Sequence, residues 1–251
     1  MNLKKIEIKI KNFIIKNFFF KKIYFYFKII KKAKKRFYYA ENSEDVIVNA
    51  LFDKIKKGVY LDIGCYHPIR GSLTYKLFKK GWKGINVDLS RESIDLFDIS
   101  RPKDLNLNMA ISDKNITTKY FQVGNINQAN SLEKINGAKK IQIDSINIDT
   151  LIKKFDLKKI DYLNIDAEGA DYKIITGFSL KKIRPILITI EDVNNNNFDL
   201  KSLLKNKMNN FFYKKNYFLY SRTACTSFYV DIKYKKIIHK VLNTTIDFTF
   251  K

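Results

Sequence analysis

Two carboxylates in the first half of the sequence stand where a parallel sheet would present them to a nucleoside. Asp62 lies in the apolar run Val59–Ile63, and Gly64 follows that run directly. A glycine at this point lets the backbone turn tightly and approach a ligand closely. Asp88 ends the next apolar run, where its carboxylate could accept both hydroxyls of a ribose. The pair therefore predicts a nucleoside-binding site.

The loop that follows Val59–Ile63 indicates which nucleoside is bound. A dinucleotide loop needs three spaced glycines so that a pyrophosphate can reach the start of a helix. Here Tyr66 and Ile69 stand at two of those places. S-adenosylmethionine has no phosphate, and its positive charge suits an acid such as Asp62. We therefore expect this cofactor, with Asp62, Gly64, Cys65 and Tyr66 in its first binding loop.

The other cofactor contacts are expected around the next strand end. Residues 105–111 read as a third strand, and polar groups near its end could contact the edge of an adenine. The expected contacts are Asn108, Ala110 and Ser112, together with Leu89, which directly follows the proposed ribose acid.

A second pair of acids is expected to perform the chemistry. Asp166 and Glu168 follow the strand Tyr162–Ile165, beside Gly169. In a doubly wound sheet this strand neighbours the first one, so Asp166 should face the transferred methyl group. Methyl transfer depends mainly on holding the nucleophile in line with the methyl group, and an alcohol must also lose its proton. The expected catalytic residues are Asp166, Glu168 and His67.

Each catalytic assignment has a structural alternative. Asp166 could cap the following helix, Glu168 could be a solvated surface acid, and His67 beside Pro68 could serve only the turn. A divalent metal is a further alternative, since Asp166, Glu191, Asp192 and Asn194 are all oxygen ligands. The simpler reading is that the acids at 191 and 192 open a loop, so no metal is expected.

Alternating strands and helices are needed to position these residues. Strands are expected at 59–63, 84–88, 105–111, 162–165, 186–190, 217–220 and 227–232, with a short strand or loop at 120–123. Helices are expected at 43–52, 72–80, 92–99, 149–155, 171–176 and 200–208, while 125–140 reads as a polar loop. This order predicts an α/β fold with a mostly parallel, doubly wound sheet in one domain at 41–251.

Composition supports a globular chain. Of the 251 residues, 45% are hydrophobic and 14% aromatic, which is too apolar for a mainly disordered protein. The two cysteines are far apart and form no CxxC, so neither a disulfide framework nor a zinc site is expected. A reduced, cytoplasmic protein is the simple interpretation.

Half of the net charge of +23 lies in an N-terminal extension. Residues 1–40 hold 13 Lys and Arg against one acid, and their lysines interrupt every apolar cluster. No charge-free run approaches the roughly 18 residues of a membrane-spanning helix. Residues 1–37 therefore read as a basic, aromatic helical segment that contacts an anionic membrane peripherally. The alternatives are a helix that covers the domain, a partner-docking arm, or a nucleic-acid contact.

Taken together, these motifs resemble the FkbM family of methyltransferases. The resemblance spans about residues 38–192 and is carried by the runs 39–47, 59–68, 80–88, 108–113 and 163–169. It implies a seven-stranded class I methyltransferase fold, S-adenosylmethionine as methyl donor, and O-methylation of a hydroxyl, with a glycan or glycan precursor as our expected acceptor. By position, Asp62 and Gly64 match the first cofactor loop, Asp88 the ribose acid, and Asp166 with Glu168 the acidic motif.

Two other functions compete with this interpretation. The basic charge suggests an RNA-binding or RNA-methylating protein, but no Pro-Cys pair or Pro-Pro-aromatic loop of nucleic-acid methyltransferases occurs. Aromatic and basic residues between 13 and 39 could still bind a single strand. A non-catalytic nucleoside-binding module is the other alternative, although such a module would not need both Asp166 and Glu168.

Overall fold

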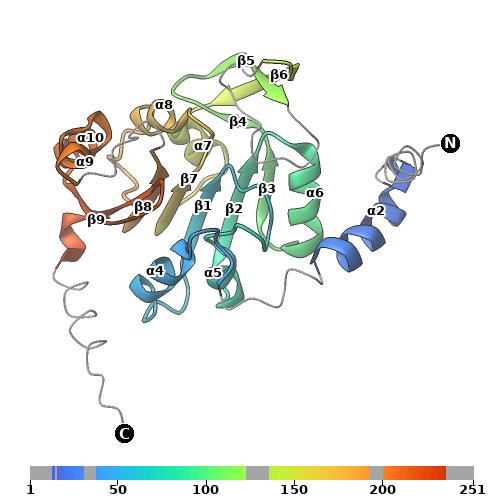
Figure 1. Cartoon of the computed structure of the whole chain (residues 1–251), viewed down its shortest axis with the longest axis horizontal. Coiled ribbons are helices and arrows are strands. Elements are labelled where there is room, and N and C mark those ends of the chain that lie inside the picture. The colour runs from blue at the N-terminus through green and yellow to red at the C-terminus, as the bar shows by residue number, and fades with distance from the viewer. Residues whose placement is uncertain (1–12, 15, 31–37, 123–135, 193–199, 236–251) are drawn as a thin grey trace, which may run out of the picture.

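The computed structural model describes residues 13–14, 16–30, 38–122, 136–192 and 200–235 (Figure 1). Its centre is a seven-stranded sheet in the order β3-β2-β1-β7-β8-β10-β9. The strands are β1 (Val59–Ile63), β2 (Lys83–Asp88), β3 (Leu105–Asn108), β7 (Tyr162–Ile165), β8 (Leu187–Glu191), β9 (Tyr217–Thr223) and β10 (Thr226–Asp231). The predicted α/β class and the mostly parallel sheet are confirmed, and only β10 runs antiparallel to its neighbours.

The strand order reverses direction beside β1. The chain builds outward from β1 to β2 and β3, then returns to the other side of β1 with β7 and β8. Strands β2 and β7 both pair with β1 in parallel, with Asp62 level with Asn86 on one side and Asn164 on the other. Such a reversal leaves a crevice at the carboxyl ends of the strands, where ligands bind in sheets of this type.

Helices cover both faces of the sheet, because successive strand residues point to opposite faces and are apolar on each. Leu61 and Leu163 face one core cluster and Tyr60 and Tyr162 the other. The first cluster is covered by α7 (Ile148–Lys154), α8 (Asp171–Thr176) and α10 (Lys207–Lys214), and the second by α4 (Glu44–Leu51) and α5 (Tyr75–Lys79). Helix α6 (Arg91–Ser100) packs beside β2 and β3.

Two predicted elements are split in the structure. The strand expected at 105–111 becomes β3 and the separate β4 (Ala110–Ile111), which leaves the main sheet for a smaller one in the order β4-β6-β5. The helix expected at 200–208 ends as α9 (Leu200–Lys205), because the side chain of Asn206 accepts a hydrogen bond from the amide of Asn209 and starts α10.

The small sheet was only partly predicted. Strand β5 (Ile116–Gln122) includes most of the strand expected at 120–123, but β6 (Lys139–Ile146) begins inside the expected loop. Residues 123–135 of that loop lie outside the described part of the chain. Strand β6 carries Ile141 and Ile143 between polar residues, and this alternation is the signal that predicts a half-exposed strand.

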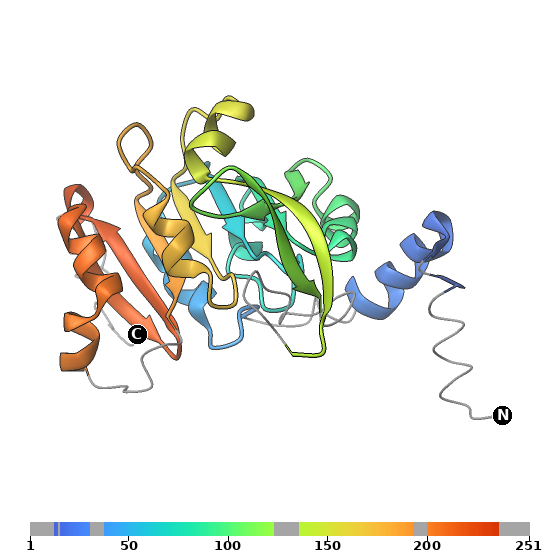
Figure 2. The ribbon, with the colours of Figure 1, turned by 90° about the horizontal axis from the view of Figure 1, so that it is seen from above.

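An additional helical segment precedes the domain. Helix α2 (Phe18–Tyr24) continues into one turn of π-helix, η1 (Phe25–Ile30), and both Figure 1 and Figure 2 show α2 at the edge of the molecule, beyond α6. Among the described residues, no helix combines the length and the apolar character needed to cross a bilayer. The domain boundary at residue 40 stays a prediction.

Candidate functional site

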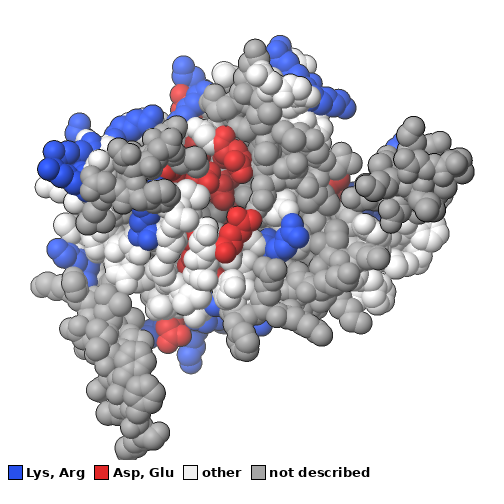
Figure 3. Space-filling model, viewed as in Figure 1, with Lys and Arg blue, Asp and Glu red and all other residues white. Residues whose placement is uncertain are grey.

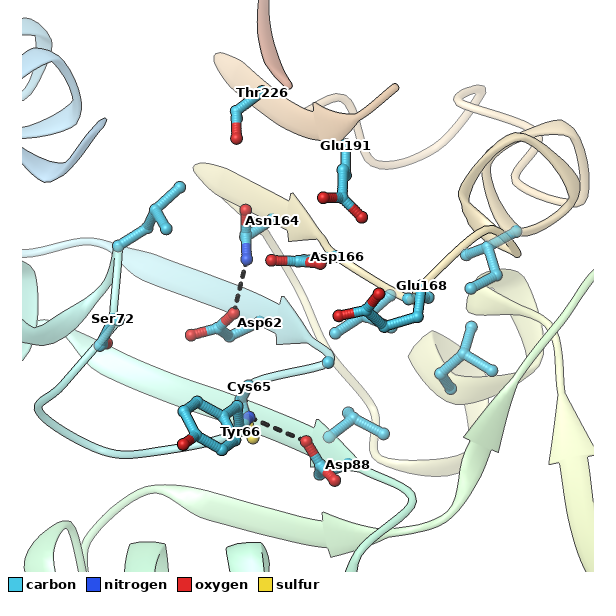
Figure 4. A pocket seen from close by; sticks show the side chains of 18 of the residues that line it. Asp62, Cys65, Tyr66, Ser72, Asp88, Asn164, Asp166, Glu168, Glu191 and Thr226 are labelled. Carbon is cyan, nitrogen blue, oxygen red and sulfur yellow. Dashed lines mark hydrogen bonds between the residues drawn. The ribbon is translucent and has the colours of Figure 1, made fainter. Parts of the chain in front are cut away.

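A cavity opens at the carboxyl ends of β1, β2, β7 and β8, where the strand order reverses (Figure 4). It encloses about 1190 Å³, counting the space that is open to solvent at its mouth. Loops after β1 and β7 form its floor, and residues 41–44 and 225–226 reach it from outside the parallel strands. The cavity therefore lies where the sheet topology places a ligand.

The cavity is acidic in a chain that is strongly basic. Among the residues described by the structure, its lining includes no Lys, Arg or His, and seven of its side chains are acids: Glu41, Glu44, Asp62, Asp88, Asp166, Glu168 and Glu191. Figure 3 shows acidic atoms gathered in the middle of this face, with most Lys and Arg toward its periphery. Negative charge in a low-dielectric hollow attracts cations and repels anions.

Gly64 allows the two halves of the site to lie in direct contact. Its φ of +76° is in the left-handed region, and a Cβ built at this position would lie 1.7 Å from the carbonyl oxygen of Asp166. Glycine was predicted here for close approach to a ligand. The structure adds that it allows the end of β1 to pack directly against the end of β7.

Asp62 is buried and fixed from both sides. Its Oδ1 accepts a hydrogen bond from Asn164 Nδ2 at 2.9 Å, and its Oδ2 accepts one from Thr74 Oγ1 at 2.7 Å. Burial raises the pKa of this carboxyl although both hydrogen bonds oppose the shift. Thr74 and Ser72 lie in the stretch predicted as the start of a helix, but α5 begins only at Tyr75.

Arg101 organises the loop behind Asp62 and was not predicted from the sequence. It is completely buried, and its guanidinium donates to Tyr60 Oη at 2.9 Å, to Thr74 Oγ1 at 2.9 Å and to the carbonyl of Pro68. It also donates to Ser72 Oγ at 2.9 Å. No sequence pattern distinguishes this arginine from its surface counterparts, because its partners come from distant parts of the chain.

Asp88 ties the first loop to the second strand. Its Oδ2 accepts from the amide of Tyr66 and its Oδ1 from the amide of Ser90, both at 2.8 Å. Burial is the main cause that raises its pKa to about 6. A carboxylate can accept about four hydrogen bonds, so both oxygens keep acceptor capacity toward the cavity. Cys65, Tyr66 and Asp88 all line the cavity, as predicted from their positions.

The structure brings only one of the next four predicted contacts to the cavity. Leu89 lines it. The side chain of Asn108 instead donates to the backbone carbonyls of Asp88, at 3.1 Å, and Leu89, at 2.9 Å. Asn108 therefore supports the loop from outside rather than contacting a ligand.

The segment after β3 presents the opposite set of side chains from the one expected. Ala110 is buried in β4, and Ser112 Oγ donates to Asp113 at 3.0 Å, whereas Met109 and Ile111 line the cavity. Neighbouring side chains of an extended chain point to opposite faces. A prediction that is shifted by one residue therefore names the side chains that point away from the cavity. The contact offered here is apolar rather than polar.

Crowded acids form the opposite end of the cavity. Figure 4 shows Asp166, Glu168 and Glu191 side by side around the same space. Burial, followed by the charges of Glu191, Asp171 and Glu168, raises the pKa of Asp166 well above its usual range. The pKa of Glu168 rises to about 7, again through burial first and then through Glu191. Acids in this state can hold a proton near neutral pH.

The turn that carries Glu168 is shaped by a different acid from the one considered in the sequence. Asp171 accepts hydrogen bonds from the amides of Ala167, at 2.9 Å, and Gly169, at 3.1 Å. Glu168 itself adopts a left-handed φ of 49°. Because Asp171 satisfies this turn, the alternative in which Asp166 caps the helix is not what the structure shows.

Glu191 was considered as a metal ligand or as the start of a loop, and at the end of β8 it also joins the acid group. Its Oε1 accepts a hydrogen bond from Cys225 Sγ at 3.2 Å. Its buried Oε2 has no hydrogen-bond partner. Burial and the neighbouring carboxylate raise the pKa of the Cys225 thiol to about 12. Cys225 therefore acts as a neutral donor.

His67 does not reach the cavity. It is buried, and its Nδ1 accepts hydrogen bonds from the amides of Ile69 and Arg70, both at 3.0 Å. Burial, with the charges of Arg70 and Arg101, lowers its pKa to about 4. The structural alternative is favoured, and we correct the assignment of His67 as a catalytic base.

The described residues contain no group of three His, Cys, Asp or Glu side chains arranged to hold a metal ion. In the alternative metal site, Asp192 Oδ2 accepts from Asn206 Nδ2 at 2.7 Å, while Asn194 lies outside the described part of the chain.

Comparison with known proteins gives one match. A family model described as "Methyltransferase FkbM domain" matches residues 62–219, from Asp62 in β1 to Leu219 in β9. No curated protein matches the chain, and no solved structure does. The matched range includes all the residues that line the cavity except Glu41, Asn42, Glu44, Cys225 and Thr226.

Proposed function

The chain belongs to the FkbM methyltransferase family, and we propose that it uses S-adenosylmethionine to methylate a hydroxyl group. The observation that carries this proposal is the cavity at the reversal of the sheet, which is lined by seven acids and by no basic side chain among the described residues. A cationic cofactor suits this lining, whereas a nucleotide with phosphates would be repelled.

The residues present fit the cofactor in three ways. Asp62 and its neighbours supply negative charge for the ammonium and the sulfonium of the cofactor, and Asp88 supplies acceptors for the ribose hydroxyls. Leu89, Met109 and Ile111 supply apolar contact for the flat base. When bound, S-adenosylmethionine supplies an electrophilic methyl group on its sulfonium.

We assign the proton transfer to the acid group at β7 and β8. A general base works best when its pKa lies near the operating pH, and the pKa of Glu168 is about 7. Glu168 is therefore proposed to take the proton of the acceptor hydroxyl. Asp166, a buried carboxyl with a raised pKa, is proposed to orient that oxygen through a hydrogen bond.

The proposed acceptor is a glycan or glycan precursor. The outer lining of the cavity offers Asn42, Thr226 and Glu41 as polar contacts, which suit a molecule rich in hydroxyls. The acid lining opposes the competing RNA-methylation function, because a phosphate backbone would enter the cavity against its charge.

Titration calorimetry with S-adenosylhomocysteine tests the cofactor assignment directly. We expect binding by the purified chain and at least tenfold weaker binding by Asp88→Asn, because an amide accepts fewer ribose hydrogen bonds. Asp98→Asn is the matched control, since Asp98 is an exposed acid outside the cavity. Failure of the unaltered chain to bind would refute the assignment.

Screening of glycans for a mass increase of one methyl group then tests the acceptor. Transfer to RNA oligonucleotides but to no glycan would leave the cofactor proposal standing and reject the acceptor.

A further inference from the structure

The helical segment α2–η1 exposes an unusual amount of apolar surface. Its exposed large hydrophobic side chains are Phe18 (70%), Phe19 (66%), Phe20 (49%), Ile23 (45%), Tyr26 (46%) and Phe27 (56%). Soluble proteins rarely leave a contiguous apolar patch of this kind facing water, and such patches usually mark an interaction surface. The proposed methyl transfer does not involve this segment.

One edge of the segment is attached to the domain. Phe25 is completely buried, and Lys21 forms an ion pair with Asp95 of α6. Burial lowers the pKa of Lys21, as expected for a lysine held against the protein. The ion pair with Asp95 fixes which side of the segment faces the domain.

The exposed apolar side chains lie on a different edge. Phe19, Ile23 and Phe27 follow one another at intervals of four residues, and Phe20 precedes Ile23 by three. Residues at these intervals share one side of a helix. The segment therefore carries a strip of apolar side chains that faces away from its attachment to α6.

Positive charge surrounds this strip. Lys16 and Lys22 are exposed, and residues 1–40 carry 13 basic side chains against the single acid Glu7. An apolar strip flanked by lysines is the pattern of a helix that lies in the plane of a membrane interface. We propose that α2–η1 binds the surface of an anionic lipid bilayer, with its aromatic side chains at the headgroup boundary.

Lipid fits this surface better than a second copy of the chain. Pairing of two such segments would bring their lysines together, and like charges at a contact weaken it. A bilayer with anionic headgroups instead offers apolar depth and negative charge at the same place, and each nearby lysine strengthens the attraction.

Flotation of the full chain with lipid vesicles tests the proposal. We expect it to bind vesicles of phosphatidylcholine mixed with phosphatidylglycerol, and to bind pure phosphatidylcholine at least tenfold more weakly. Phe19→Ser/Phe27→Ser should reduce binding about tenfold or more, because it removes two buried rings from the interface. The matched control is Tyr213→Ser, since Tyr213 is 78% exposed on α10.

Charge reversal provides the second variant. Lys16→Glu/Lys22→Glu should reduce binding to the anionic vesicles about tenfold or more, while Lys181→Glu/Lys182→Glu, which changes two exposed lysines of a domain loop, should reduce it much less. All variants should keep the thermal midpoint and the S-adenosylhomocysteine affinity of the unaltered chain, which shows that the domain remains folded.

Several outcomes would overturn the proposal. Equal binding to both vesicle types, no binding, or no effect of either variant would remove the lipid surface as the partner. Tighter binding of an RNA oligonucleotide that depends on Phe19 and Phe27 would assign the segment to nucleic acid. A dimer in the absence of vesicles that Phe19→Ser/Phe27→Ser dissociates would assign it to self-association.

Discussion

At the end of the cavity formed by β1 and β2, each oxygen of Asp62 and Asp88 accepts a hydrogen bond from the protein. At the end formed by β7 and β8, Asp166 and Glu168 instead lie among one another's charges and that of Glu191. Partnered carboxylates are held in one geometry. Burial raises the pKa of all four carboxyls; neighbouring charges add to the rise for Asp166 and Glu168, whereas hydrogen bonds oppose it for Asp62 and Asp88. This difference fits the proposed roles, in which the first end holds the cofactor and the second exchanges a proton.

The contact that joins the two ends gives the largest expected effect. Gly64→Ala should lower the free energy of unfolding by about 4 kcal/mol or more, because its Cβ would overlap backbone rather than a movable side chain. Gly81→Ala is the control. Gly81 also has a positive φ, but its Cβ would meet nothing within 4 Å, so only the backbone strain of about 1 kcal/mol is expected. Similar losses of unfolding free energy for both variants, measured in urea, would show that Gly64 does not pack tightly against the backbone of Asp166.

The partnered end is tested by removing its central donor. Arg101→Met should cost about 3 kcal/mol of unfolding free energy, because it leaves Tyr60, Thr74 and the carbonyl of Pro68 without their donor. Arg91→Met removes an arginine whose side chain is 62% exposed and should cost less than about 1 kcal/mol. A smaller loss of unfolding free energy for Arg101→Met than for Arg91→Met would contradict a stabilising role for the hydrogen bonds of Arg101.

The crowded end is tested by the rate of methyl transfer. Glu168→Gln should slow transfer about a hundredfold while binding of S-adenosylhomocysteine changes little, because the base is lost and the cofactor contacts remain. The rate of the unaltered chain should rise with pH through about 7 as Glu168 loses its proton. A pH profile that is the same in Glu168→Gln would assign the proton transfer to another group.

The last prediction concerns the pH dependence of stability. The pKa values of Glu168 and Asp171 are both about 7 in the folded chain, above their values near 4 in an unfolded one. The folded state therefore binds more protons between these values, so the free energy of unfolding should fall as the pH rises through about 7. Urea unfolding at several pH values should show a shallower decline for Glu168→Gln. A rise in the free energy of unfolding between about pH 4 and about 7 would contradict the raised pKa values of Glu168 and Asp171.

The sheet could be predicted from the sequence because its signals are local. The runs Val59–Ile63 and Tyr162–Ile165 match β1 and β7, since a short apolar run between turn residues has few other solutions. Strand β6 was missed although Ile141 and Ile143 alternate with polar residues, because the strand follows a polar stretch and its first residues, Lys139 and Lys140, continue that stretch.

The position of a residue at the cavity was predictable where its strand end alone defines that position, as for Asp62, Asp88 and Asp166. It was not predictable where partners come from far along the chain. Arg101 contacts Tyr60, which is 41 residues away, and no local pattern reports such a contact. The side chains after β3 were mispredicted for a geometric reason, since side chains alternate along this stretch and Met109 and Ile111, not Ala110, face the cavity.

The close approach at Gly64 also limits which substitutions the sequence can accept in evolution. The sequence contains only 9 glycines in 251 residues, so most of its turns have been built from other residue types. Gly64 cannot be exchanged in the same way, because any side chain there would displace the backbone of Asp166. A substitution at Gly64 would therefore move Asp166 on the neighbouring strand as well, so the loops after β1 and β7 cannot vary independently at this contact.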